Sequence, residues 1–189
     1  MPHLNFKKTT KTLVGLSFGS LFMLGCASTL PLKDGTPSQK VSVNAVTPAG
    51  IGATIGTIHL EDSQSGLVLH TQLSQLPAGP HGFHIHEVGS CAPASKDGKM
   101  GAALAAGSHF NPNKAPNHGT PLTGHLGDLP LLNVQADGTA QVTLVAPRLK
   151  LADVQGRAIM IHAGGDNYSD SPKALGGGGD RIACGVIQS

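Results

Sequence analysis

The stretch His81-Gly82-Phe83-His84-Ile85-His86-Glu87 carries two histidines one residue apart, surrounded by apolar side chains that include the following Val88. Alternate side chains of a β-strand lie on one face, so both imidazoles share one side and the phenylalanine and isoleucine share the other. We therefore predict a strand that buries one face in a hydrophobic core. Its other face directs His84 and His86 at one point, where a metal ion can bind.

Eight short apolar segments are separated by turn residues, in a chain with 26 glycines, 13 prolines and little helical periodicity. The third segment alternates cleanly between two faces, and Ala136-Asp137-Gly138 between the fifth and sixth is typical of a hairpin. The pattern predicts an all-β domain, either an antiparallel sandwich or a flattened barrel. The predicted strands are 41–47, 53–60, 67–73, 82–88, 131–134, 139–145, 158–162 and 182–187.

Further candidate metal ligands follow the first pair. Three imidazole nitrogens and one carboxylate oxygen within about twenty residues suit a closed tetrahedral zinc site. His162 ends an apolar segment predicted to be a buried strand, and with His84, His86 and one shared histidine it would form an all-nitrogen set, which is typical of copper. The four residues of the proposed zinc set are His109, His118, His125 and Asp128.

Several ordered blocks resemble the copper/zinc superoxide dismutases of the bacterial periplasmic type. The resemblance covers residues 40–189, and the ordered series is far more specific than any one block. It implies an eight-stranded antiparallel Greek-key barrel, a flattened sandwich, with two long functional loops at 89–128 and 163–181. The blocks are Gly82-Phe83-His84-Ile85-His86-Glu87, Gly107-Ser108-His109-Phe110-Asn111-Pro112, Gly124-His125-Leu126-Gly127-Asp128-Leu129-Pro130, His162-Ala163-Gly164-Gly165-Asp166 and Gly178-Gly179-Asp180-Arg181-Ile182-Ala183-Cys184-Gly185-Val186-Ile187.

The resemblance implies an enzyme that protects the cell envelope by converting superoxide to oxygen and hydrogen peroxide through alternating reduction and reoxidation of copper. One copper and one zinc ion per subunit are implied as cofactors, with His109 as a catalytic imidazolate that bridges them. The implied copper ligands are His84, His86, His109 and His162. The implied zinc ligands are His109, His118, His125 and Asp128.

Two more residues have roles that the resemblance implies. Asp166 matches an aspartate that hydrogen-bonds a ligand histidine from each metal, which fixes the orientation of the rings. Arg181 matches a catalytic arginine that guides the anionic substrate, since a guanidinium stays charged and donates in a planar fork. The alternative for Arg181 is a surface arginine that closes a glycine-rich loop. Residues 114–117, before His118, depart from the family in composition, and a site without His118 would leave zinc with three protein ligands.

The cysteines indicate an oxidised, exported protein. Of three cysteines, Cys26 ends an N-terminal apolar segment, which leaves Cys91 and Cys184 as an even pair. A disulfide between them would close a loop of about 93 residues and contribute roughly 4 to 5 kcal/mol. The alternative is two buried free thiols, which an export signal disfavours.

The N-terminus has the pattern of a signal peptide over residues 1–25. Three lysines precede an uncharged apolar run that is shorter than the about 20 residues of a membrane span. Met23-Leu24-Gly25-Cys26 resembles a bacterial lipobox, although leucine is usual where Met23 stands, and it would make Cys26 the lipidated first residue. The alternative is ordinary cleavage and a freely soluble product. Residues 26–39 are expected to form a tether.

These features place the domain of residues 40–189 in the periplasm or cell envelope of a bacterium, with membrane anchoring through a lipid on Cys26. Loss of residues 1–25 removes three lysines and no acid, so the formal net charge changes from +2 to −1. No basic stripe with interleaved aromatic residues remains, so no nucleic-acid partner is expected. The expected small-molecule partner is superoxide, and the chain is expected to be a monomer or a homodimer.

Two other classes of function fit part of the pattern. A non-enzymatic copper/zinc-binding envelope lipoprotein would use the same ligands for storage, but storage requires no anion guide such as Arg181. A zinc hydrolase also uses His-x-His, but its motif continues with Asp-His, whereas Glu87-Val88-Gly89-Ser90-Cys91 follows here. A hydrolase also needs an open metal position and a general base.

Some conspicuous residues are predicted to be structural. His59 and His70 stand singly in strand-like segments and are predicted not to bind metal. His81 would point away from the metal by strand parity and support loop packing. Glycines 176–179 lack the helix and lysine of a phosphate-binding loop, and are expected to form a tight turn near the active channel.

Overall fold

The computed structural model describes residues 1–3 and 35–189, and residues 35–189 form one compact unit. Most of the predicted signal peptide, Cys26 and most of the predicted tether lie outside the described residues. Among the residues that are described, no helix has the length and apolar character needed to cross a membrane.

Strands dominate the described chain, and its helices are single short turns. The helical elements are η1 (Leu104–Ala106), α1 (Leu151–Val154) and η2 (Leu175–Gly177). The strands are β1 (Ser38–Thr47), β2 (Gly50–Ser63), β3 (Gly66–Leu73), β4 (Gly79–His81), β5 (Phe83–His86), β6 (Ala94–Lys96), β7 (Lys99–Gly101), β8 (Leu132–Val134), β9 (Thr143–Ala146), β10 (Ala158–His162) and β11 (Arg181–Val186).

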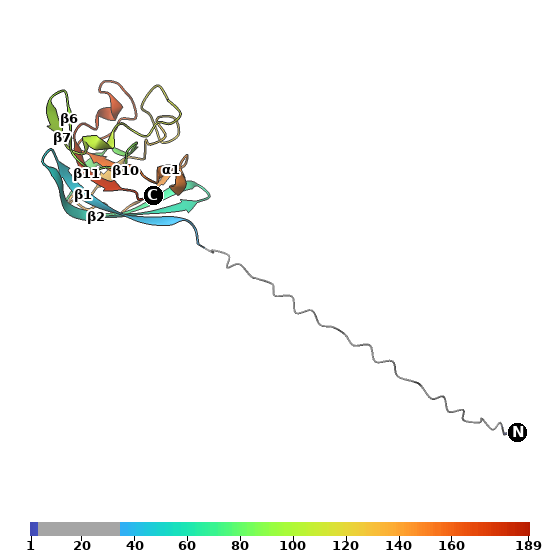
Figure 1. Cartoon of the computed structure of the whole chain (residues 1–189). Coiled ribbons are helices and arrows are strands. Elements are labelled where there is room, and N and C mark those ends of the chain that lie inside the picture. The colour runs from blue at the N-terminus through green and yellow to red at the C-terminus, as the bar shows by residue number, and fades with distance from the viewer. Residues whose placement is uncertain (4–34) are drawn as a thin grey trace, which may run out of the picture. The chain divides into compact units, whose positions relative to one another are not determined.

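The strands form a curled antiparallel sheet, in which β1, β2, β10 and β11 can be followed in Figure 1. Seven strands pair in the order β5-β10-β11-β1-β2-β3-β9, and β4 pairs with β8. Because only Gly82 separates β4 from β5, the two act as one interrupted strand, so the barrel has eight strands and the β6–β7 hairpin is separate from it. The last strand pairs with the first, and β3 pairs with β9 rather than with its successor in sequence. This is the predicted all-β, Greek-key barrel.

The core lies between the two halves of this curled sheet. Leu67, Leu69, Thr71 and Leu73 of β3 are all buried, as their alternation predicts. Phe83 and Ile85 of β5 are also fully buried in the main core cluster. Burial of each such side chain contributes about 1.5 to 3 kcal/mol, so the core face of β5 is firmly fixed.

One apolar residue of the first motif behaves differently from our expectation. Val88 is 47% exposed, because β5 ends at His86 and no longer pairs with β10 beyond that point. The backbone N–H of Val88 instead donates to the carbonyl of Ala106 in the long loop. The predicted strand 82–88 is therefore shorter, and strand parity does not govern its last residues.

The sequence did not predict the β6–β7 hairpin, which lies inside the loop after β5. Its turn is Asp97-Gly98, both with positive φ (52° and 75°), which is the backbone of a tight two-residue hairpin. The flanking residues lack the alternating apolar pattern that usually accompanies such a turn. The predicted turn at Asp137-Gly138 is present, but β9 begins later than predicted and pairs with β3.

A disulfide joins Cys91 to Cys184, with the Cα atoms 5.7 Å apart. Both cysteines are buried in a small cluster with Ala103, Ala106 and Met160, among others. The bond therefore ties the loop that follows β5 to β11, as predicted.

Replacing both cysteines with alanine should lower the free energy of unfolding by about 4 to 5 kcal/mol, because the unfolded chain regains the freedom of a long loop. Urea denaturation of the metal-free variant and parent would measure this difference. A loss below about 1 kcal/mol would show that the loop is fixed by packing alone.

Candidate metal centre

Main-chain hydrogen bonds bring the candidate ligands together. On one edge β5 pairs with β10, which places Met160 opposite His84. On the other edge the N–H of Ile85 donates to the carbonyl of Gly127, and the N–H of Phe110 donates to the carbonyl of Ile85. Isolated bridges then set His84 beside Asp128 and His86 beside His109. The loop is thus held against β5, so that its candidate ligands lie next to those of the strand.

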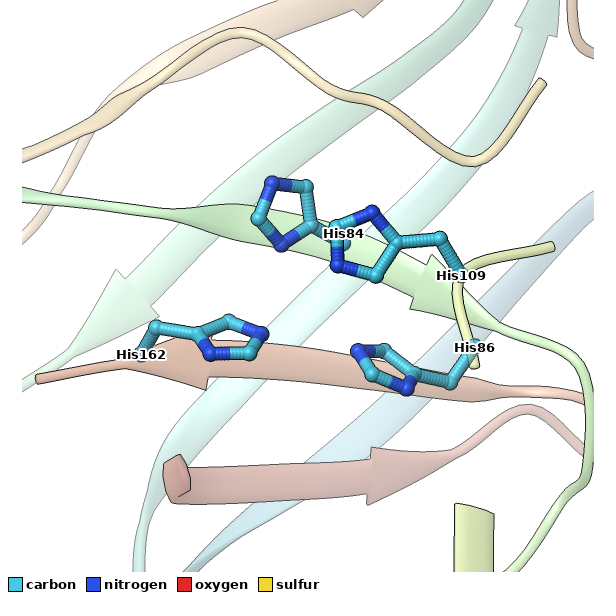
Figure 2. Close-up of side chains that lie close together, drawn as sticks. All are labelled: His84, His86, His109 and His162. Atoms are coloured by element: carbon cyan, nitrogen blue, oxygen red, sulfur yellow. The ribbon is translucent and has the colours of Figure 1, made fainter. Parts of the chain in front are cut away.

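Four buried histidines form the first cluster, and each offers a ring nitrogen within 4.8 Å of the others. Figure 2 shows the four rings gathered over β5 and β10, with His109 entering from the loop. The ring centroids of His84 and His109 are 3.9 Å apart, and those of His84 and His162 are 4.9 Å apart. The members are His84, His86, His109 and His162, the predicted copper set.

The predicted zinc residues surround the carboxylate of Asp128. Its Oδ1 lies 3.0 Å from His109 Nδ1 and 3.4 Å from His125 Nδ1, and its Oδ2 lies 3.0 Å from His118 Nδ1. The four residues here whose ligand atoms lie within 4.8 Å of one another are His84, His109, His118 and Asp128. His84 thus stands in place of His125 of the predicted zinc set. We favour His125 as a member of this set, because its Nδ1 faces Asp128 whereas His84 Nε2 is already bound to another carboxylate.

The polar atoms of these rings fit metal ions. Within residues 35–189, six buried imidazole nitrogens have no hydrogen-bond partner, which for an unpaired buried polar atom costs about 1 to 3 kcal/mol. They are His84 Nδ1, His86 Nε2, His109 Nε2, His118 Nδ1, His125 Nδ1 and His162 Nε2. Copper and zinc both accept imidazole nitrogen as a ligand, so the donor set fits both ions.

Several of these rings are also oriented through their second nitrogen. His86 Nδ1–H donates to the carbonyl of Gly107 (2.9 Å), and His162 Nδ1–H donates to that of Gly179 (3.1 Å). Such bonds fix the tautomer and leave the lone pair on the inward nitrogen. His109 is different, because its Nδ1 faces Asp128 and its Nε2 faces the four-histidine cluster.

Asp166 links the two clusters through one carboxylate. Its Oδ2 accepts from His84 Nε2–H and its Oδ1 accepts from His118 Nε2–H, both at 2.8 Å. A side chain at Gly176, whose φ is +71°, would collide with this carboxylate. The glycine-rich segment therefore turns tightly here so that its backbone can pass close to Asp166.

Arg181 lies beside the four-histidine cluster, at the start of β11. Its Nη1 donates to the carbonyl of Ala103 and its Nη2 to that of Gly107, both at 2.6 Å. The carbonyl of Gly107 therefore accepts from both Arg181 and His86. This shared acceptor fixes a positive charge next to the histidines, and Ala103 belongs to the cluster packed around the disulfide.

Burial and carboxylates divide the histidines into two electrostatic groups. Burial lowers the pKa of His84 to about 3 and that of His162 to about 4, and it lowers the pKa of His86 and His109 as well. For His118, burial also lowers the pKa, but the carboxylates of Asp128 and Asp166 outweigh it and raise the pKa to about 9. Burial opposes ionisation of both aspartates, yet hydrogen bonds from histidines hold each pKa below its usual range.

Two residues that support the centre were not predicted from the sequence pattern. Arg148, after β9, donates to the carbonyls of Pro121 (2.6 Å), Gly124 (3.1 Å) and His125 (2.7 Å), and so holds the loop that carries His125. Glu87 accepts from the N–H of Ser108, immediately before His109. No spacing rule connects residues so distant in the chain.

The fold and site define a β-barrel metalloprotein with two adjoining metal positions. The sequence profile described as copper/zinc superoxide dismutase (SODC) matches residues 54–187. The chain is 50% identical over 175 residues to Cu-Zn superoxide dismutase 2 of Salmonella typhimurium, which covers 92% of this chain and 98% of the relative. It is 52% identical over 153 residues to the Cu-Zn superoxide dismutase of Escherichia coli K12, with 80% and 88% covered.

Solved structures agree with the sequence comparisons. The Cu/Zn superoxide dismutase from Brucella abortus superposes with a TM-score of 0.79 at 48% identity, and covers 80% of this chain and 100% of that one. The monomeric copper, zinc enzyme from Salmonella enterica gives a TM-score of 0.72 at 52% identity, with the same coverage. The chain therefore belongs to the copper/zinc superoxide dismutase family. It is an enzyme that converts superoxide to oxygen and hydrogen peroxide with copper and zinc as cofactors.

In the metal-free protein, His118 should titrate near pH 9, whereas His84 and His162 should stay neutral down to about pH 4. Because the folded pKa of His118 is raised, its interactions stabilise the metal-free fold fully below the ordinary pKa of 6.5. That contribution is lost as the pH rises through about 9. Imidazole NMR signals followed against pH would measure each titration.

His118→Gln should remove the high-pH titration, and it should also raise the pKa of Asp128 and of Asp166, because each carboxylate loses its interaction with the His118 ring. A His118 signal that changes below pH 7 would contradict the dominance of the two carboxylates.

Proposed function

We propose that copper is held by the four-histidine cluster and zinc by the residues around Asp128, with His109 shared between them. The observation that carries this assignment is the set of six buried imidazole nitrogens without partners, which converge from two sides on His109. The proposed copper ligands are His84, His86, His109 and His162. The proposed zinc ligands are His109, His118, His125 and Asp128.

When bound, copper supplies a one-electron redox couple and zinc an ion of fixed valence. In our proposal the chain contributes the proton and the position of the substrate. His109 Nε2 would carry a proton only when it is not bound to copper, while Asp128 would keep the Nδ1 side of the ring fixed. Arg181 attracts and binds the anion next to that proton, because its guanidinium is fixed by two carbonyls.

The competing functions have less support. The neighbouring Arg181 and the close similarity to curated dismutases favour catalysis over metal storage. A zinc hydrolase would need an open zinc position, whereas three histidines and one aspartate make a closed set.

We also propose that residues 1–25 are a signal peptide and that Cys26 carries a lipid in the bacterial envelope. The predicted tether, residues 26–39, would then lead to the catalytic domain of residues 40–189, but its last two residues already pair with β2 as the start of β1. Support comes from the basic and apolar N-terminal pattern and from the disulfide, which forms in oxidising compartments. The description of the Salmonella enterica relative as monomeric supports a monomer over a homodimer. Sedimentation equilibrium would separate the two.

Protein loaded with copper and zinc should remove superoxide rapidly, and protein loaded with zinc alone should not, because zinc has a single accessible valence. Pulse radiolysis would measure both rates. Equal rates would exclude copper chemistry at this site.

His109→Ala should retain some of each metal. It should abolish the magnetic and spectroscopic coupling between copper and a cobalt ion substituted for zinc. Unchanged coupling would overturn the bridge assignment.

Arg181→Ala should slow superoxide removal by about tenfold or more and weaken its dependence on salt, because the charge that steers the anion is lost. Both metals should remain bound. Arg181→Lys should recover part of the rate, since lysine keeps the charge but not the planar fork. Lys99→Ala, on the exposed hairpin, is the matched control, and an equal effect there would mean that overall charge alone matters.

Cys26→Ser should release the protein from membranes if Cys26 carries a lipid, because the acyl chains would be lost. Fractionation of cells that express the parent and the variant, with metabolic labelling by a fatty acid, would test this. Unlabelled parent protein in the soluble fraction would favour ordinary cleavage.

A further inference from the structure

Two histidines outside the metal centre form an unexpected pair. His59 of β2 and His70 of β3 stand directly opposite each other across an antiparallel ladder. Their ring centroids are 6.1 Å apart, with an angle of 23° between the ring planes. Because each stands singly in its segment, we predicted from the sequence that neither binds metal. Strand register nevertheless brings together two rings that sequence spacing keeps apart.

The separation of these rings suits one shared metal ion. In the metal centre, the ring centroids of His118 and His125 are 5.9 Å apart, and those of His109 and His162 are 6.0 Å apart. Two imidazoles that bind one ion place their nitrogens about 2.0 to 2.1 Å from it. The centroid separation of the pair on β2 and β3 is therefore close to that of rings proposed to share one ion.

The pair lies on the outer face of the sheet and is open to solvent. Its neighbours in sequence along β2, Ile58 and Leu60, point into the core, while both histidines are partly exposed. The rings border a surface hollow of about 480 Å³ that is also lined by Lys40, Thr57 and Gln72. The hollow has room for an ion with water ligands.

One ring is already oriented for coordination. His70 Nδ1 lies 3.0 Å from Thr143 Oγ1 on β9. When Nδ1–H donates to that hydroxyl oxygen, the lone pair is left on Nε2, as in metal sites where the second ring nitrogen donates to an oxygen. The two nearby charges oppose each other, because Lys40 stands opposite His59 and Glu61 follows two residues later on the same face.

We propose that His59 and His70 form an exposed binding site for a divalent transition-metal ion, with a preference for Cu(II). Imidazole ligands favour late first-row metals, and affinity among these ions is highest for copper. Water and the Gln72 amide are available to complete the coordination. This site uses none of the residues of the metal centre, so it is independent of the proposed catalytic assignment.

The test uses the full chain with copper and zinc already loaded and without an affinity tag. Equilibrium dialysis against Cu(II) should detect one additional ion per chain, and EPR should show two nitrogen ligands. His59→Gln and His70→Gln should each weaken this binding by at least about tenfold. The double variant should bind the added Cu(II) ion with the same affinity as the more impaired single variant, because chelation is already lost when either histidine is replaced.

Thr57→Ala, which alters the same hollow without removing an imidazole, is the matched control and should leave the added ion in place. Superoxide removal should be unchanged in all four variants, which verifies that the fold and catalytic site are intact. Failure to take up an added ion would overturn the proposal. Losses of binding free energy that add in the double variant would also overturn it, since additivity indicates that the two histidines bind ions independently.

Discussion

Burial of histidine nitrogens that have no hydrogen-bond partner is the constraint on which the centre depends. An unpaired polar nitrogen in an apolar surrounding is unfavourable, so a chain that gathers six of them needs compensation from its surroundings. The rigid barrel supplies part of it, because Phe83 and Ile85 hold the core side of the strand that carries His84 and His86. The same burial keeps most of the rings neutral, and neutral imidazole is the form that binds metal.

Two carboxylates give the centre its order. Asp128 faces three histidines at once, and Asp166 spans from His84 to His118. Because Asp166 touches both clusters, a shift of one ring is transmitted to the other through a single side chain. The shared carbonyl of Gly107 plays a similar part for Arg181 and His86. The geometry of each proposed metal position therefore depends on that of the other position and on that of Arg181.

The sequence was most informative where local pattern decides structure. Alternation in β3 and β5 depends on contacts within and beside one strand, so the strands and the burial of Phe83 could be predicted. The proposed ligand set rests on ordered motifs alone, because His84 and His162 come together through pairing across the sheet and not through sequence spacing. Arg148 and the pairing of His59 with His70 could not be predicted for the same reason, since long-range register leaves no periodic signal. The β6–β7 hairpin is local, but its strands lack the alternating apolar residues by which a hairpin is recognised.

The loop that carries His109 and Asp128 is attached to β5 by main-chain hydrogen bonds at Ile85, Phe110 and Gly127. Every residue type except proline offers the same N–H and carbonyl groups. Side chains at exposed positions between the ligands, such as residue 113, therefore have no part in holding the loop in place and can vary without displacing the histidines. Gly124 and Gly127 are different, because a Cβ there would collide with Asp128 and with the carbonyl of Ile85. The centre thus has evolutionary latitude in the segment that surrounds its chemistry, except where the backbone itself passes close to a ligand.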